Sequence, residues 1–298
     1  MKIGILEPEG FSKKALKILK NIGEVSLYKK DNPIKEFIKD KDIIFIRLRY
    51  YISKELLEKS SVKIVCSPTT GFNHIDLDYL NKEKIKYISL KDEYEFLSNI
   101  RATPEHTFGL VLALLRNYKK VFCNNCSFKD RDKLKGEEIF GKNIGIIGLG
   151  RVGKVLARYF EVFGANVFYN DIKKIDCNYT FLSKKDLIKK SDIILLCANY
   201  LKENQDMIDK DLLDLMCGKY FINTARGELI NENHLLELLE KNHFKGVALD
   251  VIKDELNSKK FLELKKYGAL VTPHIAGATY ESMHKTEEFM VKKLKEIL

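Results

Sequence analysis

A glycine-rich turn near the middle of the chain constrains its fold more than any other feature. Gly148-Leu149-Gly150-Arg151-Val152-Gly153 follows the apolar run Ile144–Ile147 and precedes the helix-like segment Lys154–Phe160. A strand that passes through a tight turn into a helix is typical of a parallel sheet with crossover helices. Because the turn lies near residue 150 of 298, we expect a separate domain to precede the one that it opens.

Short apolar runs alternate with helix-like segments along the whole chain, which also predicts parallel sheets. A long helix is expected between Ser98 and Tyr118, and an amphipathic helix over Tyr280–Leu298 is expected to pack back on the first domain. The predicted strands of the first sheet are Ile3–Leu6, Val25–Tyr28, Ile43–Arg47, Lys63–Ser67 and Lys86–Leu90. Those of the second, larger sheet are Asn143–Ile147, Asn166–Asn170, Thr180–Leu182, Ile193–Ala198, Tyr220–Asn223, Gly246–Val251 and Leu270–Pro273.

Composition excludes several classes of protein. Lys and Arg exceed Asp and Glu by 52 to 42, but the basic residues are spread along the chain without a nucleic-acid-binding motif, so no nucleic-acid partner is expected. No apolar run approaches the roughly 18 residues of a membrane-spanning helix, and no secretory signal is visible, so we expect a cytoplasmic protein without a membrane partner. The Cys123–Cys126 pair has no second pair beside it, so no metal is expected.

The glycine turn predicts a dinucleotide cofactor. Its glycines permit close approach of the backbone, so that the N–H groups of the following helix face a pyrophosphate. Eighteen residues after Gly153, Asp171 ends the next strand, where a carboxylate accepts hydrogen bonds from the adenosine ribose and repels a 2′-phosphate. The sequence therefore predicts NAD, while Lys173 and Lys174 leave NADP open as an alternative.

Three polar residues follow later strands. Arg226 comes after Phe221–Ala225, Glu255 after Ala248–Val251, and His274 after Leu270–Pro273. Ligands bind outside the carboxyl ends of the strands of an open parallel sheet, so these side chains are expected to converge there. Taken singly, each also has an ordinary structural explanation, as a solvated cation, a charge in a turn and a loop histidine.

Together these segments resemble the D-isomer-specific 2-hydroxyacid dehydrogenases over nearly the whole chain. The resemblance implies an α/β fold in which a Rossmann nucleotide-binding domain (99–274) is inserted in a discontinuous flavodoxin-like α/β substrate domain (1–98 and 275–298). It also implies an NAD-linked redox reaction and a homodimer formed through the nucleotide-binding domains. The segments that carry the resemblance are Gly148–Gly153, Ile222–Leu229, Ala248–Val251 with Glu255, and Thr272–Gly277.

The chemistry of that family suits the three polar residues. Oxidation of a 2-hydroxy acid needs a base that titrates near neutrality, a role that fits His274. Glu255 would orient the imidazole and stabilise its charged form, and Arg226 would hold the substrate carboxylate with two parallel donors. The resemblance also implies that Asp250 meets the nicotinamide carboxamide. The predicted cofactor-binding residues are Gly148, Gly150, Arg151, Val152, Gly153, Asp171, Ala198, Thr224, Ala225, Arg226, Asp250, His274 and Ala276.

The first domain most resembles that of the 3-phosphoglycerate dehydrogenases. Arg47 and Arg49 stand where that branch has a substrate-engaging Arg-x-Arg, and Asn99 lies in a segment similar to one with a substrate-contacting Asn. Thr70 and Gly71 begin a loop that resembles the family's backbone cradle for the substrate carboxylate. We therefore expect a small anionic 2-hydroxy or 2-oxo acid, with 3-phosphoglycerate first. Reduction of hydroxypyruvate or glyoxylate, a sugar-derived substrate, and NAD sensing without turnover remain open.

The chain departs from the family pattern at several positions. Leu256 replaces the usual Pro after the catalytic Glu, and Phe128 stands in place of a usual Trp. Cys197 and Asn199 occupy positions where many members have His and Pro. Because the sequence ends at Leu298, serine feedback through a C-terminal regulatory domain is not expected.

Overall fold

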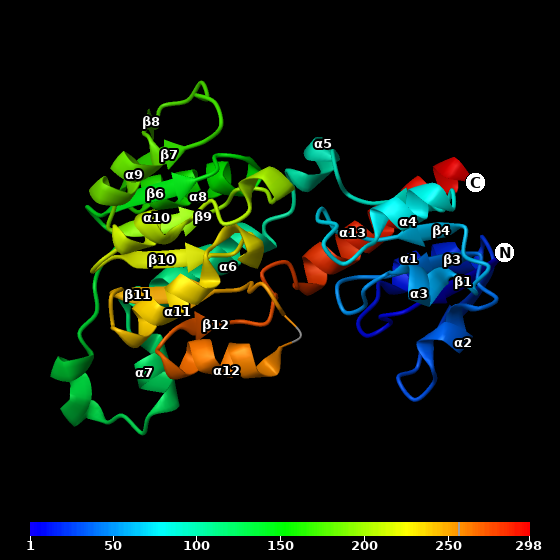
Figure 1. Cartoon of the computed structure of the whole chain (residues 1–298), viewed down its shortest axis with the longest axis horizontal. Helices are drawn as coiled ribbons and strands as arrows, with labels where there is room; N and C mark the ends of the chain where they lie inside the picture. Colours follow the sequence, from blue (N-terminus) through cyan, green and yellow to red (C-terminus); the bar gives the residue numbers. More distant parts are fainter. Residues whose placement is uncertain (256) are drawn as a thin grey trace. The chain divides into compact units, whose positions relative to one another are not determined.

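Every strand pairing in the described part of the chain is parallel, and the strands form two separate sheets (Figure 1). The computed structural model describes residues 1–255 and 257–298, so Leu256 lies outside the described residues. One unit, here called the split unit, consists of Met1–Ile100 and Ala278–Leu298. The other, the central unit, is Arg101–Gly277. The limits expected from the sequence are 1–98 with 275–298 for the first domain and 99–274 for the second.

The sheet of the split unit has the order β2-β1-β3-β4-β5, which is that of flavodoxin-like folds. All five predicted strands are present, and their ends lie at most two residues from the predicted ones. This order confirms the predicted fold of the unit. The strands are β1 (Lys2–Ile5), β2 (Glu24–Leu27), β3 (Ile43–Phe45), β4 (Ile64–Cys66) and β5 (Lys86–Ile88).

The C-terminal helix α13 (Tyr280–Ile297) packs on this unit, as predicted, and is drawn in red beside the blue and cyan elements in Figure 1. Met290, Val291 and Leu294 of α13 share a core with residues of β1, and Phe289 stacks on Phe96 with ring centroids 3.9 Å apart. The other helices of the unit are α1 (Lys13–Lys20), α2 (Ile34–Ile38), α3 (Lys54–Leu57), α4 (Leu77–Lys82) and α5 (Tyr94–Leu97).

The sheet of the central unit has the order β12-β11-β10-β9-β6-β7-β8. This is the Rossmann order with one added strand, and the direction of winding reverses between β6 and β9, directly beside the glycine turn. The seven predicted strands are therefore confirmed. They are β6 (Asn143–Ile147), β7 (Asn166–Asn170), β8 (Thr180–Phe181), β9 (Ile193–Leu196), β10 (Tyr220–Asn223), β11 (Gly246–Leu249) and β12 (Leu270–Val271).

The long helix expected between Ser98 and Tyr118 is shorter and interrupted. Helix α6 spans Ala102–Leu115, and α7 (Tyr118–Cys123) begins after Asn117, which has a left-handed φ of 54° that ends the helical hydrogen bonding. The remaining helices of the central unit are α8 (Arg151–Val162), α9 (Lys184–Lys190), α10 (Lys210–Asp214), α11 (Glu232–Glu240) and α12 (Ser258–Lys266), with 3-10 turns η1 (Phe128–Leu134), η2 (Lys202–Asn204) and η3 (Gly227–Leu229).

Both faces of each sheet are buried, because alternate residues of a strand enter different cores. Ile43 and Phe45 of β3 belong to one core of the split unit, while Ile44 belongs to the other. Phe221 of β10 and its neighbour Ile222 are divided in the same way between the two cores of the central unit. Polar side chains therefore lie at the ends of the strands. Among the described residues, no helix is long and apolar enough to cross a membrane.

Candidate active site

The glycine turn joins the end of β6 to the start of α8. A Cβ at Gly153 would lie 2.2 Å from the carbonyl oxygen of Gly148, so only glycine lets α8 pack this closely against the turn. A Cβ at Gly150, the N-cap residue of α8, would meet no neighbouring atom within 4 Å. The N-terminus of α8 is therefore open to an anionic group. The other predicted residues of this region lie beside it: Arg151 and Val152 begin α8, and the backbone of Ala198 packs against the turn.

Asp171 links the end of β7 to the glycine turn. Its carboxylate accepts hydrogen bonds from the backbone N–H of Leu149, at 2.7 Å, and of Ile172, at 2.8 Å. Each carboxylate oxygen has a further lone pair that can accept from a hydroxyl. The open helix N-terminus and this carboxylate at the next strand end together fit the pyrophosphate and ribose of NAD.

His274 and Glu255 form a hydrogen-bonded pair. Nδ1 of His274 lies 2.8 Å from the Glu255 carboxylate. Because the carboxylate accepts, Nδ1 carries the proton, and Nε2 of a neutral imidazole is left with its lone pair. The side chains are 22% and 39% exposed, so the pair can be reached from solvent.

The loop that carries His274 is held by a buried carboxylate. Asp250 accepts hydrogen bonds from the Thr272 hydroxyl at 2.6 Å and from the N–H groups of Ile275 and Ala276 at 2.9 Å. Burial acts to raise the pKa of Asp250, but these bonds and one from His106 hold it below its usual value. The charged Asp250 thereby fixes the turn in which His274 adopts a left-handed φ of 50°. Its side chain is fully buried, and its predicted contact with the nicotinamide carboxamide stays a prediction.

Arg226 follows β10 in a loop shaped by Asn223. The Asn223 side chain accepts from the N–H of Ala225 and donates to the carbonyl of Arg226, both at 2.9 Å. Nη1 of Arg226 donates to the Ala225 carbonyl at 2.6 Å. Burial lowers the pKa of Arg226, while Glu255 and Glu228 oppose this shift, and the guanidinium stays charged.

The Arg226 loop and the Glu255 loop touch through their backbones. A Cβ at Gly227 would lie 2.1 Å from the carbonyl carbon of Ile252 and 2.3 Å from the nitrogen of Lys253. The buried Glu232 accepts from the N–H of Lys253 at 3.0 Å. These contacts fix the segment just before Glu255 against the residue just after Arg226. Thr224, at the start of the Arg226 loop, is held by a 2.7 Å contact between its hydroxyl and that of Thr107.

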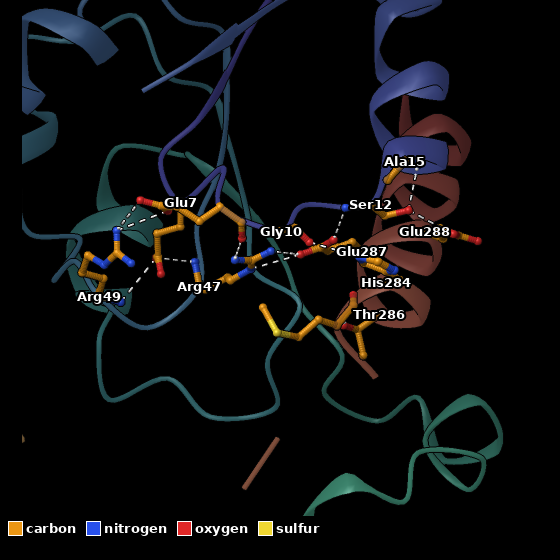
Figure 2. Close-up of polar contacts among 12 residues, drawn as sticks. Glu7, Gly10, Ser12, Ala15, Arg47, Arg49, His284, Thr286, Glu287 and Glu288 are labelled. Atoms are coloured by element: carbon orange, nitrogen blue, oxygen red, sulfur yellow. Dashed lines mark hydrogen bonds and ion pairs between the residues drawn. The ribbon is translucent and has the colours of Figure 1, made fainter. Parts of the chain in front are cut away.

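The arginines predicted to bind substrate are in the split unit, and they differ in their partners (Figure 2). Arg47 donates from Nε to the buried Glu287 at 3.0 Å, pairs with it through Nη2, and donates from Nη1 to the carbonyl of Glu9 at 2.9 Å. Its guanidinium thus joins α13 to the sheet. Arg49 is 40% exposed and forms an ion pair with the Glu9 carboxylate, at 3.3 Å, with Tyr50 and Glu7 also close enough to interact with its guanidinium. The Glu7 carboxylate accepts from the backbone N–H of both arginines (Figure 2).

The other predicted substrate residues also lie in the split unit. Thr70 is exposed after β4, and the carbonyl of Gly71 accepts from the Thr69 hydroxyl at 3.1 Å. Asn99 is exposed after α5. The structure brings Arg226, Asp250, Glu255 and His274 together within the central unit. Sequence reasoning missed the supporting residues Asn223, Thr272 and His106, although the first two lie within motif segments.

Comparisons with known proteins identify the family of this chain. Residues 108–276, more than half of the chain, match the family model described as the D-isomer specific 2-hydroxyacid dehydrogenase, NAD binding domain. A provisionally named 2-hydroxyacid dehydrogenase of Staphylococcus saprophyticus is 31% identical over 287 residues, which covers 90% of this chain and 87% of the relative. The chain belongs to the D-isomer-specific 2-hydroxyacid dehydrogenase family.

Solved structures support the same conclusion for this dehydrogenase. A D-lactate dehydrogenase of Aquifex aeolicus, in complex with NAD and lactic acid, is 27% identical with a TM-score of 0.83, over 100% of this chain and 95% of that one. A D-lactate dehydrogenase of Escherichia coli, at 22% identity and a TM-score of 0.84 over 100% and 96%, shares the fold. The protein is an NAD-dependent oxidoreductase that acts on the CH–OH group of D-2-hydroxy acids.

Proposed function

We propose that His274 is the acid–base residue of this dehydrogenase, that Glu255 orients it, and that Arg226 holds the substrate carboxylate. The contact between His274 Nδ1 and Glu255, at 2.8 Å, carries the proposal. It leaves Nε2 as the nitrogen that exchanges a proton with substrate, and it supplies a negative charge beside the imidazolium that results. A histidine without this partner would have neither a fixed tautomer nor a stabilised charged form.

In oxidation, Nε2 takes the proton of the substrate C2 hydroxyl, and Glu255 stabilises the imidazolium that forms. In reduction, the imidazolium returns this proton to the carbonyl oxygen of the 2-oxo acid. Bound NAD supplies the nicotinamide ring that accepts or returns a hydride at C2. Arg226 binds the carboxylate with two parallel N–H donors, which orients C2 and its oxygen relative to Nε2.

The glycine turn and Asp171 are our proposed cofactor contacts. The N–H groups at the start of α8 would meet the pyrophosphate where Gly150 leaves open space. Asp171 would accept from the adenosine ribose, and its negative charge favours NAD over a 2′-phosphorylated cofactor. The other predicted cofactor-binding residues lie just after the strands of the central unit or in the first turn of α8.

A 3-phosphoglycerate-like acid is our first candidate substrate, and Arg49 is the residue that we propose for its phosphate. Arg49 is exposed, and its guanidinium pairs with the solvent-exposed carboxylate of Glu9, so a phosphate can compete for it. The Arg47 guanidinium already donates hydrogen bonds to Glu287 and to the Glu9 carbonyl, and we therefore assign it a structural role. Only one of the two expected guanidinium groups is therefore available to bind a phosphate. This favours a second candidate, an unphosphorylated 2-oxo acid such as hydroxypyruvate or glyoxylate.

Steady-state oxidation of NADH with phosphohydroxypyruvate, hydroxypyruvate and glyoxylate separates these candidates. The first candidate predicts a kcat/KM at least about tenfold higher for phosphohydroxypyruvate than for hydroxypyruvate, and Arg49→Gln should remove most of this preference. Lys30→Gln is the matched control, because Lys30 also lies near the Glu9 carboxylate, at 3.8 Å. Equal rates with both acids support the second candidate, and no turnover with any 2-oxo acid would contradict the proposed function.

A further inference from the structure

Helix α6 contacts two of the three loops that carry the proposed catalytic residues of the central unit, the Arg226 loop and the His274 loop. Thr107 donates its hydroxyl proton to the carbonyl of Thr103 at 2.8 Å, so Thr224 must donate in the 2.7 Å contact between the two hydroxyls. The adjacent His106 reaches the other loop. Its Nε2 lies 3.2 Å from the Thr272 hydroxyl oxygen and 3.4 Å from Asp250 Oδ1.

The direction of the hydrogen bonds at His106 follows from its neighbours. The single hydroxyl proton of Thr272 is directed to Asp250 at 2.6 Å, so the Thr272 oxygen can only accept from His106. Asp250 is fully buried and charged, and it also can only accept. Nε2 of His106 therefore carries a proton and donates to this pair.

The pair that His106 supports determines the backbone around His274. Asp250 accepts from the N–H groups of Ile275 and Ala276, and its own carbonyl accepts from the N–H of His274 at 2.8 Å. Left-handed backbone at a histidine is unfavourable unless surrounding bonds maintain it. Without the His106 donor, the Thr272 oxygen loses a partner, and the buried Asp250 charge loses a favourable neighbour.

We propose that His106 is a positioning residue, which holds the Thr272–Ala276 turn through Thr272 and Asp250 and thereby orients His274. This inference rests on the proposed role of His274 in the reaction. His106 itself contacts neither His274 nor Glu255 among the described contacts. Its side chain is 22% exposed and acts through the buried carboxylate.

Two substitutions test the donor at this position. His106→Leu removes the donor, whereas His106→Gln retains an N–H at a position similar to Nε2. We expect His106→Leu to lower kcat by about tenfold or more, since small displacements of a catalytic group have effects of this size. His106→Gln should stay within about threefold of wild type. His234→Leu is the matched control, because the His234 side chain, which is 13% exposed, contacts Asp214 at 2.8 Å and Glu237 at 3.1 Å and neither loop among the described contacts.

Hydrogen–deuterium exchange of the peptide that contains residues 272–277 provides a readout that does not depend on turnover. Exchange there should accelerate in His106→Leu and remain at the wild-type rate in His106→Gln and His234→Leu. Thr272→Val, which removes the hydroxyl between His106 and Asp250, should reproduce the faster exchange if His106→Leu fails to fold. The dissociation constant of NADH, from fluorescence titration, should change less than kcat.

Wild-type exchange and wild-type kcat in His106→Leu would overturn the inference. It would also be overturned if both variants lost turnover without faster exchange, because the imidazole would then act on the substrate directly. Absence of turnover in the wild-type protein would defeat the proposed function instead, since the exchange comparison would still report on the turn.

Discussion

In the proposed reaction, the role of Arg226 depends on the shape of its side chain more than on its charge. The Asn223 side chain holds the Arg226 backbone, and the guanidinium presents parallel donors that match a carboxylate. Glu255 has a different requirement, because it needs only an acceptor within reach of His274 Nδ1. The role that we propose for His274 needs a nitrogen that can both accept and release a proton near neutral pH. These separate requirements allow each residue to be tested by a substitution that keeps one property and removes another.

Arg226→Lys keeps the positive charge and removes the two-donor geometry. We expect KM for the 2-oxo acid to rise by about tenfold or more, because a single ammonium cannot form the paired hydrogen bonds. The dissociation constant of NADH should change little. Steady-state kinetics and fluorescence titration measure these two quantities, and an unchanged KM would remove Arg226 from carboxylate binding.

At the residue level, sequence reasoning identified side chains that stand directly after strands. His274, Glu255 and Arg226 occupy such positions, and the structure places them in one region of the central unit. The partner of Arg47 could not be predicted, since Glu287 lies 240 residues away and meets it only through the packing of α13. His106 was missed for a related reason, because it stands within a largely apolar helix and outside every recognised motif.

At the level of elements, apolar runs bounded by charged or turn residues predicted the strands of both sheets. The runs were informative because both faces of each sheet are buried, so strands appear as continuous apolar segments. The extent of α6 was predicted less well. No glycine or proline directly follows Leu115 to mark the end of the helix, whereas in the structure Asn117 adopts a left-handed conformation.

The contact between the Arg226 and Glu255 loops leads to a prediction about Gly227. Gly227→Ala would place a Cβ 2.1 Å from the carbonyl carbon of Ile252, so the two loops must separate. We expect a loss of about 1–3 kcal/mol in the free energy of unfolding, together with reduced turnover. Urea denaturation measures the loss. Gly109→Ala in α6 is the control, because its Cβ meets no neighbouring atom within 4 Å and should be neutral or stabilising. Equal stability of both variants would contradict this account.

Glu137 joins three segments of the central unit and gives the protein a predictable response to acid. It accepts from Lys142 at 2.7 Å, Lys245 at 2.5 Å and Tyr220 at 2.8 Å. Burial acts to raise the pKa of Glu137, but these partners hold it at about 2, below its usual 4.5. A carboxyl whose pKa is lower in the folded state stabilises the fold above its unfolded pKa, and this stabilisation is lost as pH falls toward 2.

Glu137→Gln should therefore reduce the acid sensitivity of the protein. We expect the variant to be less stable near neutral pH by about 1–2 kcal/mol, with a difference from wild type that shrinks at acidic pH. Thermal unfolding at a series of pH values tests this. If the difference in stability between wild type and variant were the same at every pH, ionisation of Glu137 would not contribute to the stability of the fold.

At the scale of the whole molecule, the order of motifs along the chain predicted how the two folds are arranged in sequence. A nucleotide-binding fingerprint near residue 150, followed by an amphipathic C-terminal helix, indicated that one domain interrupts the other. The strand orders and the two segments of the split unit have this arrangement. Substrate identity could not be predicted in the same way, because the proposed assignment depends on which arginines already bind other side chains, and the Arg47–Glu287 contact joins residues far apart in the sequence.

We propose that two copies associate through the central unit, which exposes several large apolar side chains. Phe140 and Val162 are 76% and 83% exposed, and Phe163 lies beside Phe108 with ring centroids 4.8 Å apart. Exposed apolar area of this kind is typical of an interface. Light scattering should give twice the 34.5 kDa chain mass, and Phe140→Glu should shift the protein toward the single chain. A monomeric wild type would contradict this proposal.

The proposed reaction depends on His274 as the acid–base residue, held by Glu255. The most direct test compares kcat for NADH-dependent reduction of the best 2-oxo acid by wild type and His274→Ala, with NADH binding measured on the same samples. Our account predicts a loss of about 100-fold or more in kcat, with NADH affinity within about threefold of wild type. A His274→Ala variant that keeps wild-type kcat would contradict it.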